Sequence, residues 1–377
     1  MMPVTVINVV QDLHVGGTER RMLNLAAALD RERFKPVVCC IDRLGPLADE
    51  AAGLGMAPVV LGRRWRYDLS GVRGLAGVVR REPRAIVHSW LYLANVFGRL
   101  GGRIGGAAGV VAADGATEIP ASPGKRLVAE RVDRALSMLS DSIVANSHAV
   151  AASLRARGIP ARKITVIHNG VAVAPPASPE EVAQLRASLG VPVAAPLVGM
   201  VARLTAVNKD HETFLRAAAR IRRERPDVSF ALVGDGPEHR RLVSLAEALG
   251  ISDNVVFAGH RPDARRLISA FDVSVLCSLY EGFSNVVLES MASARPVVAT
   301  DIAPNREAIE DGVHGMLVPL RDDAAAANAI ARLLADPAEA ARLAARGRQR
   351  VVSEFSLAAQ SERTMELYER LLRARRA

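Results

Sequence analysis

Two glutamates eight residues apart, Glu281 and Glu289, stand in the stretch "SLYEGFSNVVLESM" directly after the apolar run "DVSVLC". Ser284 or Asn285 is a suitable helix N-cap, which predicts a helix from about Asn285 onward. Glu281 then lies in the loop before that helix, and Glu289 lies about 6 Å along its axis. Helix starts favour phosphate, and a carboxylate can accept hydrogen bonds from neighbouring sugar hydroxyls. The spacing fits a nucleotide sugar, although a loop glutamate with an exposed helical one remains the alternative.

Basic residues and glycines mark two further junctions between strands and helices. Arg203 follows the apolar run "APLVGMV", and Lys209 comes six residues later, before the helical pattern "DHETFLRAAARIRRE". A guanidinium fork and a lysine point charge suit a diphosphate. Gly16 and Gly17 follow the first apolar run, where glycines let backbone N–H groups approach an anion. A tight turn is the alternative explanation for the two glycines.

Two residues in the first half are candidates for contact with a substrate. His88 ends the apolar segment "RAIVHSW", where a structural hydrogen bond and a substrate contact are both open. Asp114 in "VAADGATE" could face an acceptor. The chain has no D-x-D pair and no cluster of His, Cys and Asp, so no bound metal and no cofactor are expected.

The elements that must position these residues alternate between short strands rich in Val and Ile and helical stretches. This alternation predicts parallel sheets covered by helices on both faces. The proline-rich stretch "AVAPPASPEE" separates two such runs. We therefore expect an α/β fold of two doubly wound, Rossmann-like domains across a cleft: residues 1–173, joined by a returning C-terminal helix at about 357–377, and residues 174–356. Ligands of such sheets bind beyond the carboxyl ends of the strands.

Composition and charge limit the classes of function. There is no run of about 18 apolar residues and no basic leader with a cleavage site, so a cytoplasmic protein is expected. No G-x-G-x-x-G follows the first strand, which argues against a dinucleotide enzyme. Few aromatic residues and no recognised motif argue against a nucleic-acid-binding protein.

The net charge of +9 lies entirely in the first half, where residues 1–173 hold 23 Lys and Arg and 14 Asp and Glu. Residues 62–84 hold seven of these arginines, together with Trp65 and Tyr67. Arginine beside interfacial aromatic residues suits a lipid headgroup layer. We therefore predict peripheral attachment to the inner face of the membrane, centred on Arg63, Arg64 and Arg66, with a solvated basic surface as the alternative.

Taken together, "GGTE", "VIHNGV", "VARL" with Lys209, "LVGDGPE" and "YEGFSNVVLESMASARPVVATD" resemble the family 4 (group 1) retaining glycosyltransferases of GT-B architecture. The resemblance covers nearly the whole chain in order and spacing. It implies that Glu281 contacts the donor sugar and Glu289 the ribose. It also implies that Arg203 and Lys209 bind the diphosphate, that the backbone around Phe283, Ser284 and Asn285 lies at the phosphates, and that His88 lies near the transferred sugar.

The resemblance implies transfer of a sugar from a nucleotide-diphosphate donor, with a UDP-sugar favoured, to a hydroxyl of a glycan or lipid-linked glycan. It further implies retention of configuration and no metal, in cell-surface polysaccharide or glycolipid synthesis. Ser284 stands where many members have glycine, and Ala303 and Pro304 stand where a glycine pair is commoner, which leaves the sugar open. A nucleotide-sugar epimerase or hydrolase on the same fold is the alternative.

Overall fold

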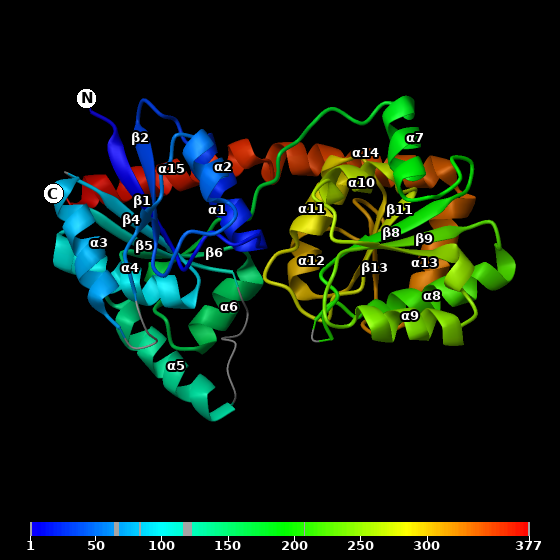
Figure 1. Cartoon of the computed structure of the whole chain (residues 1–377), viewed down its shortest axis with the longest axis horizontal. Coiled ribbons are helices and arrows are strands. Elements are labelled where there is room, and N and C mark those ends of the chain that lie inside the picture. Colours follow the sequence, from blue (N-terminus) through cyan, green and yellow to red (C-terminus); the bar gives the residue numbers. More distant parts are fainter. Residues whose placement is uncertain (1, 64–67, 83, 116–122, 207, 376–377) are drawn as a thin grey trace. The chain divides into compact units, whose positions relative to one another are not determined.

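The computed structural model of the chain describes residues 2–63, 68–82, 84–115, 123–206 and 208–375. Its contacts divide into two compact units (Figure 1). The first unit comprises Met1–Asn169 and Leu357–Ala377, and the second comprises Gly170–Ser356. Each unit is a parallel sheet with helices on both faces, so the predicted fold class of two doubly wound Rossmann-like domains is confirmed.

The first unit is built on a seven-stranded parallel sheet. In sheet order its strands are β3 (Val59–Val60), β2 (Phe34–Cys40), β1 (Val4–Val10), β4 (Ile86–Trp90), β5 (Gly109–Asp114), β6 (Ser142–Ala145) and β7 (Ile164–Val166). All seven residues of β1 are buried and five of them are apolar; because successive side chains point to opposite faces, they pack on both sides of the sheet.

Helices cover both faces of this sheet. They are α1 (Gly17–Ala28), α2 (Ala48–Gly53), α3 (Ser70–Arg81), α4 (Tyr92–Gly105), α5 (Pro123–Ser137), α6 (His148–Ala156) and α15 (Leu357–Ala374), with a 3₁₀ turn at Ala161–Lys163. Ile7 and Val9 share one core with α3 and α4. On the opposite face, Val6 packs in a cluster with α15.

The second unit has a six-stranded parallel sheet. In sheet order its strands are β10 (Val255–Gly259), β9 (Ser229–Val233), β8 (Leu197–Val201), β11 (Val273–Leu276), β12 (Val297–Thr300) and β13 (Met316–Val318). Its helices are α7 (Pro179–Ser188), α8 (His211–Glu224), α9 (His239–Ala248), α10 (Ala264–Leu267), α11 (Asn285–Ala292), α12 (Ala303–Ala308), α13 (Asp323–Ala335) and α14 (Pro337–Glu354), with 3₁₀ turns at Ser252–Asn254 and Ile268–Ala270.

The C-terminal helix α15, red in Figure 1, returns to the first unit as predicted. Leu367 and Tyr368 are buried there against Val4, Phe34 and Ile86, and Met365, Leu371 and Leu372 pack beside them. This apolar face explains why the segment is helical and ordered rather than an exposed tail. Among the described residues, no helix has the length and apolar character needed to cross a membrane.

Candidate active site

Two loops of the second unit meet because their strands are neighbours. β8 and β11 pair in parallel, so their carboxyl ends open at the same edge of the sheet. The backbone N–H of Leu279, after β11, donates to the carbonyl oxygen of Asn208, after β8, at 2.8 Å. Asp210 caps α8, and its carboxylate accepts from the Thr213 hydroxyl at 2.7 Å. These contacts fix the loop that carries Lys209.

Lys209 and Glu281, predicted separately, are in contact in the structure. The Lys209 ammonium pairs with Oε1 of Glu281, and the Ser278 hydroxyl donates to the same oxygen at 2.7 Å. Both charged side chains are largely buried. The basic partner that the sequence around Glu281 lacks therefore comes from the neighbouring loop, and the pair holds a carboxylate and a cation at one point of the sheet edge.

The helix after Glu281 begins where the sequence predicts. Ser284 is the N-cap of α11, and its side chain accepts from the backbone N–H of Val287 at 3.4 Å. Phe283 is buried, and its ring packs against Phe355 at 5.4 Å between centroids. Phe283 can therefore offer only its backbone to a ligand, whereas Asn285 opens the helix and is half-buried. Backbone N–H groups at a helix start can bind an anion.

Glu289 lies in the second turn of α11 and lines a cavity of about 460 Å³. Arg265, Ser269 and the prolines of the linker at 175–176 line the same cavity. Burial raises the pKa of the Glu289 carboxyl to about 7, against the opposing charge of Arg265. Among the described residues its carboxylate has no hydrogen bond or ion pair. A half-buried, unpaired carboxyl in a cavity is a candidate ligand contact.

Arg203 lies two residues beyond β8, as predicted, and its side chain is exposed. Within the described part of the chain, its guanidinium makes no hydrogen bond or ion pair. It is therefore available to an anionic ligand at the edge that carries Lys209. The second unit thus contains five predicted residues at one sheet edge and the helix that follows: Arg203, Lys209, Glu281, Ser284 and Glu289.

In the first unit, Gly16 is the N-cap of α1 and Gly17 its first residue. A Cβ on Gly16 would lie 2.3 Å from Oε2 of Glu19 and 2.7 Å from Nε2 of His14, so a larger residue there would require both side chains to move. Gly17 has open space around it. Glu19 was not predicted as a functional residue; it is buried, and burial is the main cause that raises its pKa.

His88 lies inside the sheet, two residues before β4 ends, rather than on a surface. It is 1% exposed, stacks on Trp90 at 4.5 Å between ring centroids, and joins its Nδ1 to the Tyr368 hydroxyl of α15 at 2.7 Å. Burial lowers its pKa to about 3, helped by the charge of Arg21, so the ring is neutral at physiological pH. Its Nε2 is buried and has no partner among the described residues. No local pattern in the sequence predicts the Tyr368 contact, because the two residues are 280 positions apart.

Asp114 and Arg21 lie at the carboxyl edge of the same sheet. Asp114 ends β5, and its carboxylate accepts from the Arg157 guanidinium at 2.9 Å. Arg21 was not predicted: it donates to the side-chain oxygen of Asn169 at 2.6 Å and lies over Trp90, 5.0 Å from the ring centroid. Burial lowers the Arg21 pKa to about 10. A cation in this environment suits a site that handles anionic groups.

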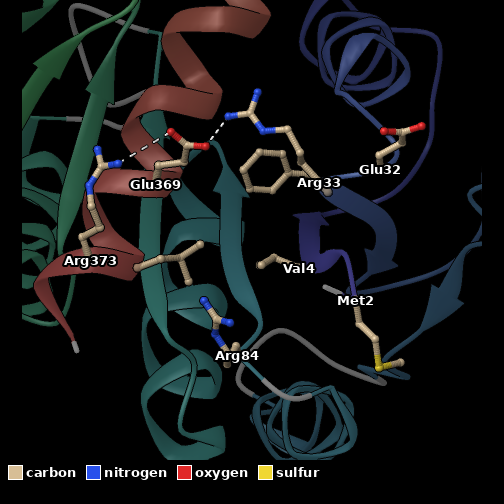
Figure 2. Close-up of a pocket in the computed structure, with 9 residues that line it drawn as sticks. Met2, Val4, Glu32, Arg33, Arg84, Glu369 and Arg373 are labelled. Carbon is tan, nitrogen blue, oxygen red and sulfur yellow. Dashed lines mark hydrogen bonds and ion pairs between the residues drawn. The ribbon is translucent and has the colours of Figure 1, made fainter.

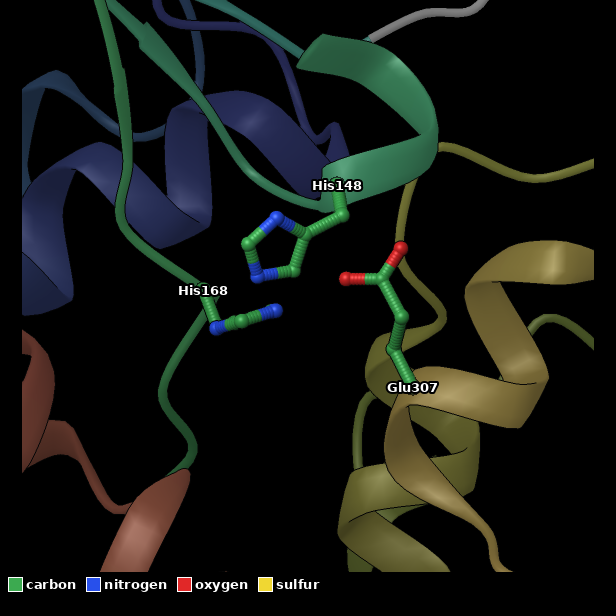
Figure 3. Close-up of side chains that lie close together, drawn as sticks. All are labelled: His148, His168 and Glu307. Atoms are coloured by element: carbon green, nitrogen blue, oxygen red, sulfur yellow. The ribbon is translucent and has the colours of Figure 1, made fainter. Parts of the chain in front are cut away.

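Two other features of the first unit lie outside the predicted set. Figure 2 shows a cavity of about 280 Å³ where β1 and β2 begin, with Arg33 and Arg373 directed at Glu369. This is the amino edge of the sheet, away from the candidate site. Figure 3 shows the imidazoles of His148, which opens α6, and His168, which follows β7, with ring centroids 5.6 Å apart. The histidines lie at the carboxyl edge and were missed in the sequence.

Both units match known protein families. Residues 15–174 match the model of Glycosyltransferase Family 4, and residues 195–336 match that of Glycosyl transferases group 1. The alpha-maltose-1-phosphate synthase of Mycolicibacterium smegmatis is 30% identical over 316 residues, 77% of this chain and 80% of that protein. The lipopolysaccharide core biosynthesis glycosyltransferase LpsE of Rhizobium meliloti is 36% identical over 228 residues, 60% of this chain and 64% of LpsE.

For the first relatives matched, the aligned stretch spans 42–64% of the relative's length. Among solved structures, Anabaena Alr3699/HepE in complex with UDP-glucose superposes with a TM-score of 0.86 at 23% identity, covering 97% of this chain and 99% of HepE. At that identity the likeness concerns the fold. Because the family models, the mycobacterial relative and the fold agree, the chain belongs to the family 4 (group 1) glycosyltransferases of GT-B architecture.

Proposed function

We propose that this protein transfers a sugar from a nucleotide-diphosphate donor, with a UDP-sugar favoured, to a hydroxyl of a glycan or lipid-linked glycan. The observation that carries the proposal is the contact between Lys209 and Glu281 beside the start of α11. A carboxylate that can accept from sugar hydroxyls thus lies next to a cation and a helix start, both of which suit a diphosphate. LpsE is named for lipopolysaccharide core synthesis, and HepE is solved with UDP-glucose, which supports this class of reaction.

Each part of the donor has a proposed partner in the second unit. Arg203, Lys209 and the backbone at 283–285 would hold the diphosphate, Glu281 the sugar, and Glu289 the ribose. In the first unit, the glycines at 16 and 17 would bring backbone N–H groups to the same anion. Asp114 would face the acceptor, and we assign acceptor binding to the first unit and donor binding to the second.

The proposed reaction breaks the bond between the sugar C1 and the diphosphate oxygen and forms a bond between C1 and the acceptor oxygen. The acceptor proton goes to the leaving diphosphate, and attack from the face that it leaves retains the configuration. Arg203, Lys209 and the N–H groups of α11 would stabilise the charge of the leaving group, a role that requires no metal. Because His88 is buried and its pKa is lowered to about 3, its imidazole is a weak base, and we propose that it positions β4 against α15 instead of accepting a proton.

A lipid-linked acceptor would bring the enzyme to a membrane surface, as a cytoplasmic, peripheral protein. The sequence places that contact at residues 62–84, of which residues 64–67, with Trp65 and Tyr67, lie outside the described residues. In the described part, Arg63 pairs with Asp42 at 2.5 Å, and α3 directs Val72, Leu75 and Val79 into the core. Leu69, just before α3, is 56% exposed, so the described part of this segment offers one large apolar side chain to a surface.

The experiment is a thermal-shift panel of UDP-, GDP- and ADP-sugars in EDTA, followed by product analysis with and without saccharide acceptors. A ligand that binds only the native state raises the melting temperature, and about 100 Kd of ligand adds about 2.7 kcal/mol. We expect one nucleotide class to stabilise the protein and to release its diphosphate only when an acceptor is present. Donor turnover without any acceptor would instead indicate the epimerase or hydrolase, and activity restored only by Mg²⁺ or Mn²⁺ would contradict the metal-free mechanism.

A further inference from the structure

Helix α5 of the first unit exposes large apolar side chains that an ordinary surface helix would bury. Four large apolar side chains point to solvent: Leu127 is 53% exposed, Val128 61%, Val132 40%, and Met138, just after the helix, 54%. At 100° per residue they fall on one arc with Arg131, Arg134 and Ala135, which are also exposed. We call this set of seven residues the outer face of α5.

Two polar residues of α5, Asp133 and Ser137, point inward instead. Asp133 is buried, and its carboxylate accepts from the buried Arg99 at 2.5 Å and lies 3.7 Å from Arg157. Glu130 pairs with Arg126 at 2.9 Å, and Ser137 is buried. The ion pairs of Asp133 therefore join the helix to Arg99 of α4 and to Arg157 after α6, while Leu127, Val128 and Val132 stay exposed. A surface helix normally buries its apolar side chains and exposes its charged ones, so the outer face indicates an apolar occupant.

Charge identifies the kind of occupant. Residues 123–163 hold eight Lys and Arg and three acidic residues. All three carboxylates are already paired with an arginine. Two are the pairs of Asp133 and Glu130 described above, and the third is Asp141, which pairs with Arg103 at 2.5 Å. On the outer face itself, the guanidiniums of Arg131 and Arg134 have no ion pair among the described residues, and none of the seven residues of the face is acidic.

Cations extend beyond the end of the helix. Arg134 lies over Gly158, and the Lys163 ammonium donates to the carbonyl oxygens of Met138 and Ser140 at 2.7 Å. Arg155 and Arg162, on the segments next to these contacts, are exposed. A second copy of the chain seated on the outer face through a two-fold axis would bring these like charges together, which is unfavourable.

We propose that the outer face of α5 is a membrane-binding surface, with its apolar side chains in the headgroup–acyl boundary and its arginines on anionic headgroups. A helix that lies in the membrane interface combines exposed apolar side chains with basic ones. Arginine suits such a helix because it carries its charge on a long apolar stem, which can lie along the apolar side chains. The inference rests on the proposed function in one respect: a lipid-linked acceptor gives the enzyme a reason to reach the bilayer. It places a membrane contact on a second element of the same unit, in addition to the one that the sequence predicts at residues 62–84.

The test is sedimentation of the full-length protein with phosphatidylcholine vesicles, with and without phosphatidylglycerol. The apolar variant is Val128→Ser with Val132→Ser, and the charge variant is Arg131→Ser. The matched controls are Val352→Ser on α14, also half exposed, and Arg370→Ser on α15. We expect the wild type and both controls to bind anionic vesicles. The apolar variant should lose about tenfold in partitioning, and the charge variant should lose most of its preference for phosphatidylglycerol.

Two further measurements keep the outcome interpretable. Circular dichroism shows that each variant is folded, and the thermal shift with nucleotide sugars shows that the donor site is intact. Loss of vesicle binding with an unchanged donor response supports this surface without bearing on the transfer reaction. Absence of vesicle binding by the wild type, or equal binding by variants and controls, would overturn the proposal. So would a wild-type dimer that the apolar variant converts to a monomer.

Discussion

At the residue scale, the two glutamates of the donor loop differ because their surroundings differ. Glu281 pairs with Lys209 and accepts from Ser278, whereas Glu289 lies unpaired in a cavity, and burial raises its pKa to about 7. A carboxylate that is held in place can accept hydrogen bonds from sugar hydroxyls in only one arrangement. An unpaired carboxyl has free lone pairs for the two hydroxyls of a ribose. The same residue type thus serves two proposed roles through its neighbours.

The raised pKa of Glu289 predicts a pH dependence of stability. Between an unfolded pKa of about 4.5 and the folded value of about 7, the native carboxyl binds more protons than the unfolded one, so stability falls as the pH rises through that window. Glu289→Gln removes the charge and should be more stable than the wild type at pH 8, by on the order of 1–3 kcal/mol, but not at pH 4.

Calorimetric melting of the wild type and Glu289→Gln at pH 4 and pH 8 measures this difference. Glu247→Gln is the control, because Glu247 is exposed on α9 of the same unit. If Glu289→Gln and the control gave the same change at both pH values, the carboxyl would not be buried as the structure has it.

At the scale of elements, α15 is joined to the sheet by a polar contact inside an apolar cluster. The Tyr368 hydroxyl meets Nδ1 of His88, and its ring packs edge-on against Phe34 at 5.5 Å between centroids. Burial holds the Tyr368 pKa far above its usual range, so the hydroxyl stays protonated and the hydrogen bond is neutral on both sides. The contact fixes the register of the returning helix on β4.

Tyr368→Phe should therefore destabilise the first unit while keeping its packing. The ring stays, but the imidazole of His88 is left with both nitrogens unpaired in a buried site, which costs about 1–3 kcal/mol. The chain has two tryptophans, Trp65 and Trp90, both in the first unit, so their emission reports the unfolding of that unit. The urea midpoint should fall for Tyr368→Phe and stay constant for Tyr280→Phe, an exposed tyrosine in the second unit. An unchanged midpoint would mean that the hydrogen bond does not stabilise the first unit.

Local signals allowed some elements to be predicted and not others. The start of α11 follows from one cap residue, and Ser284 caps it as expected. The burial of His88 could not be predicted, because it depends on a helix 280 positions away in the chain. The inverted face of α5 was also missed. Its apolar residues suggest a core helix, and only the ion pairs of Asp133 with Arg99 and Arg157 show which side faces inward.

At the scale of the whole molecule, alternating strands and helices were sufficient to predict two Rossmann-like units and a returning helix. The pairing of Lys209 with Glu281 was not predictable, since it requires β8 and β11 to be neighbours in the sheet although 72 residues separate the two side chains. The order of the strands in the sheet therefore determines that these two residues meet, which their spacing along the chain does not show. It converts two weak local motifs into one site, and the family membership agrees with that site.

The central claim is that this site binds the donor diphosphate through Lys209 without a metal. Titration calorimetry of UDP and UDP-glucose in EDTA tests it with the wild type, Lys209→Ala and the control Lys35→Ala, whose lysine is exposed in the first unit. Because a charge-assisted contact contributes about 1.5–3 kcal/mol, we predict that Lys209→Ala binds both ligands at least about tenfold more weakly and that Lys35→Ala binds like the wild type. Equal affinity of Lys209→Ala and the wild type, or binding that appears only when Mg²⁺ is added, would contradict the account.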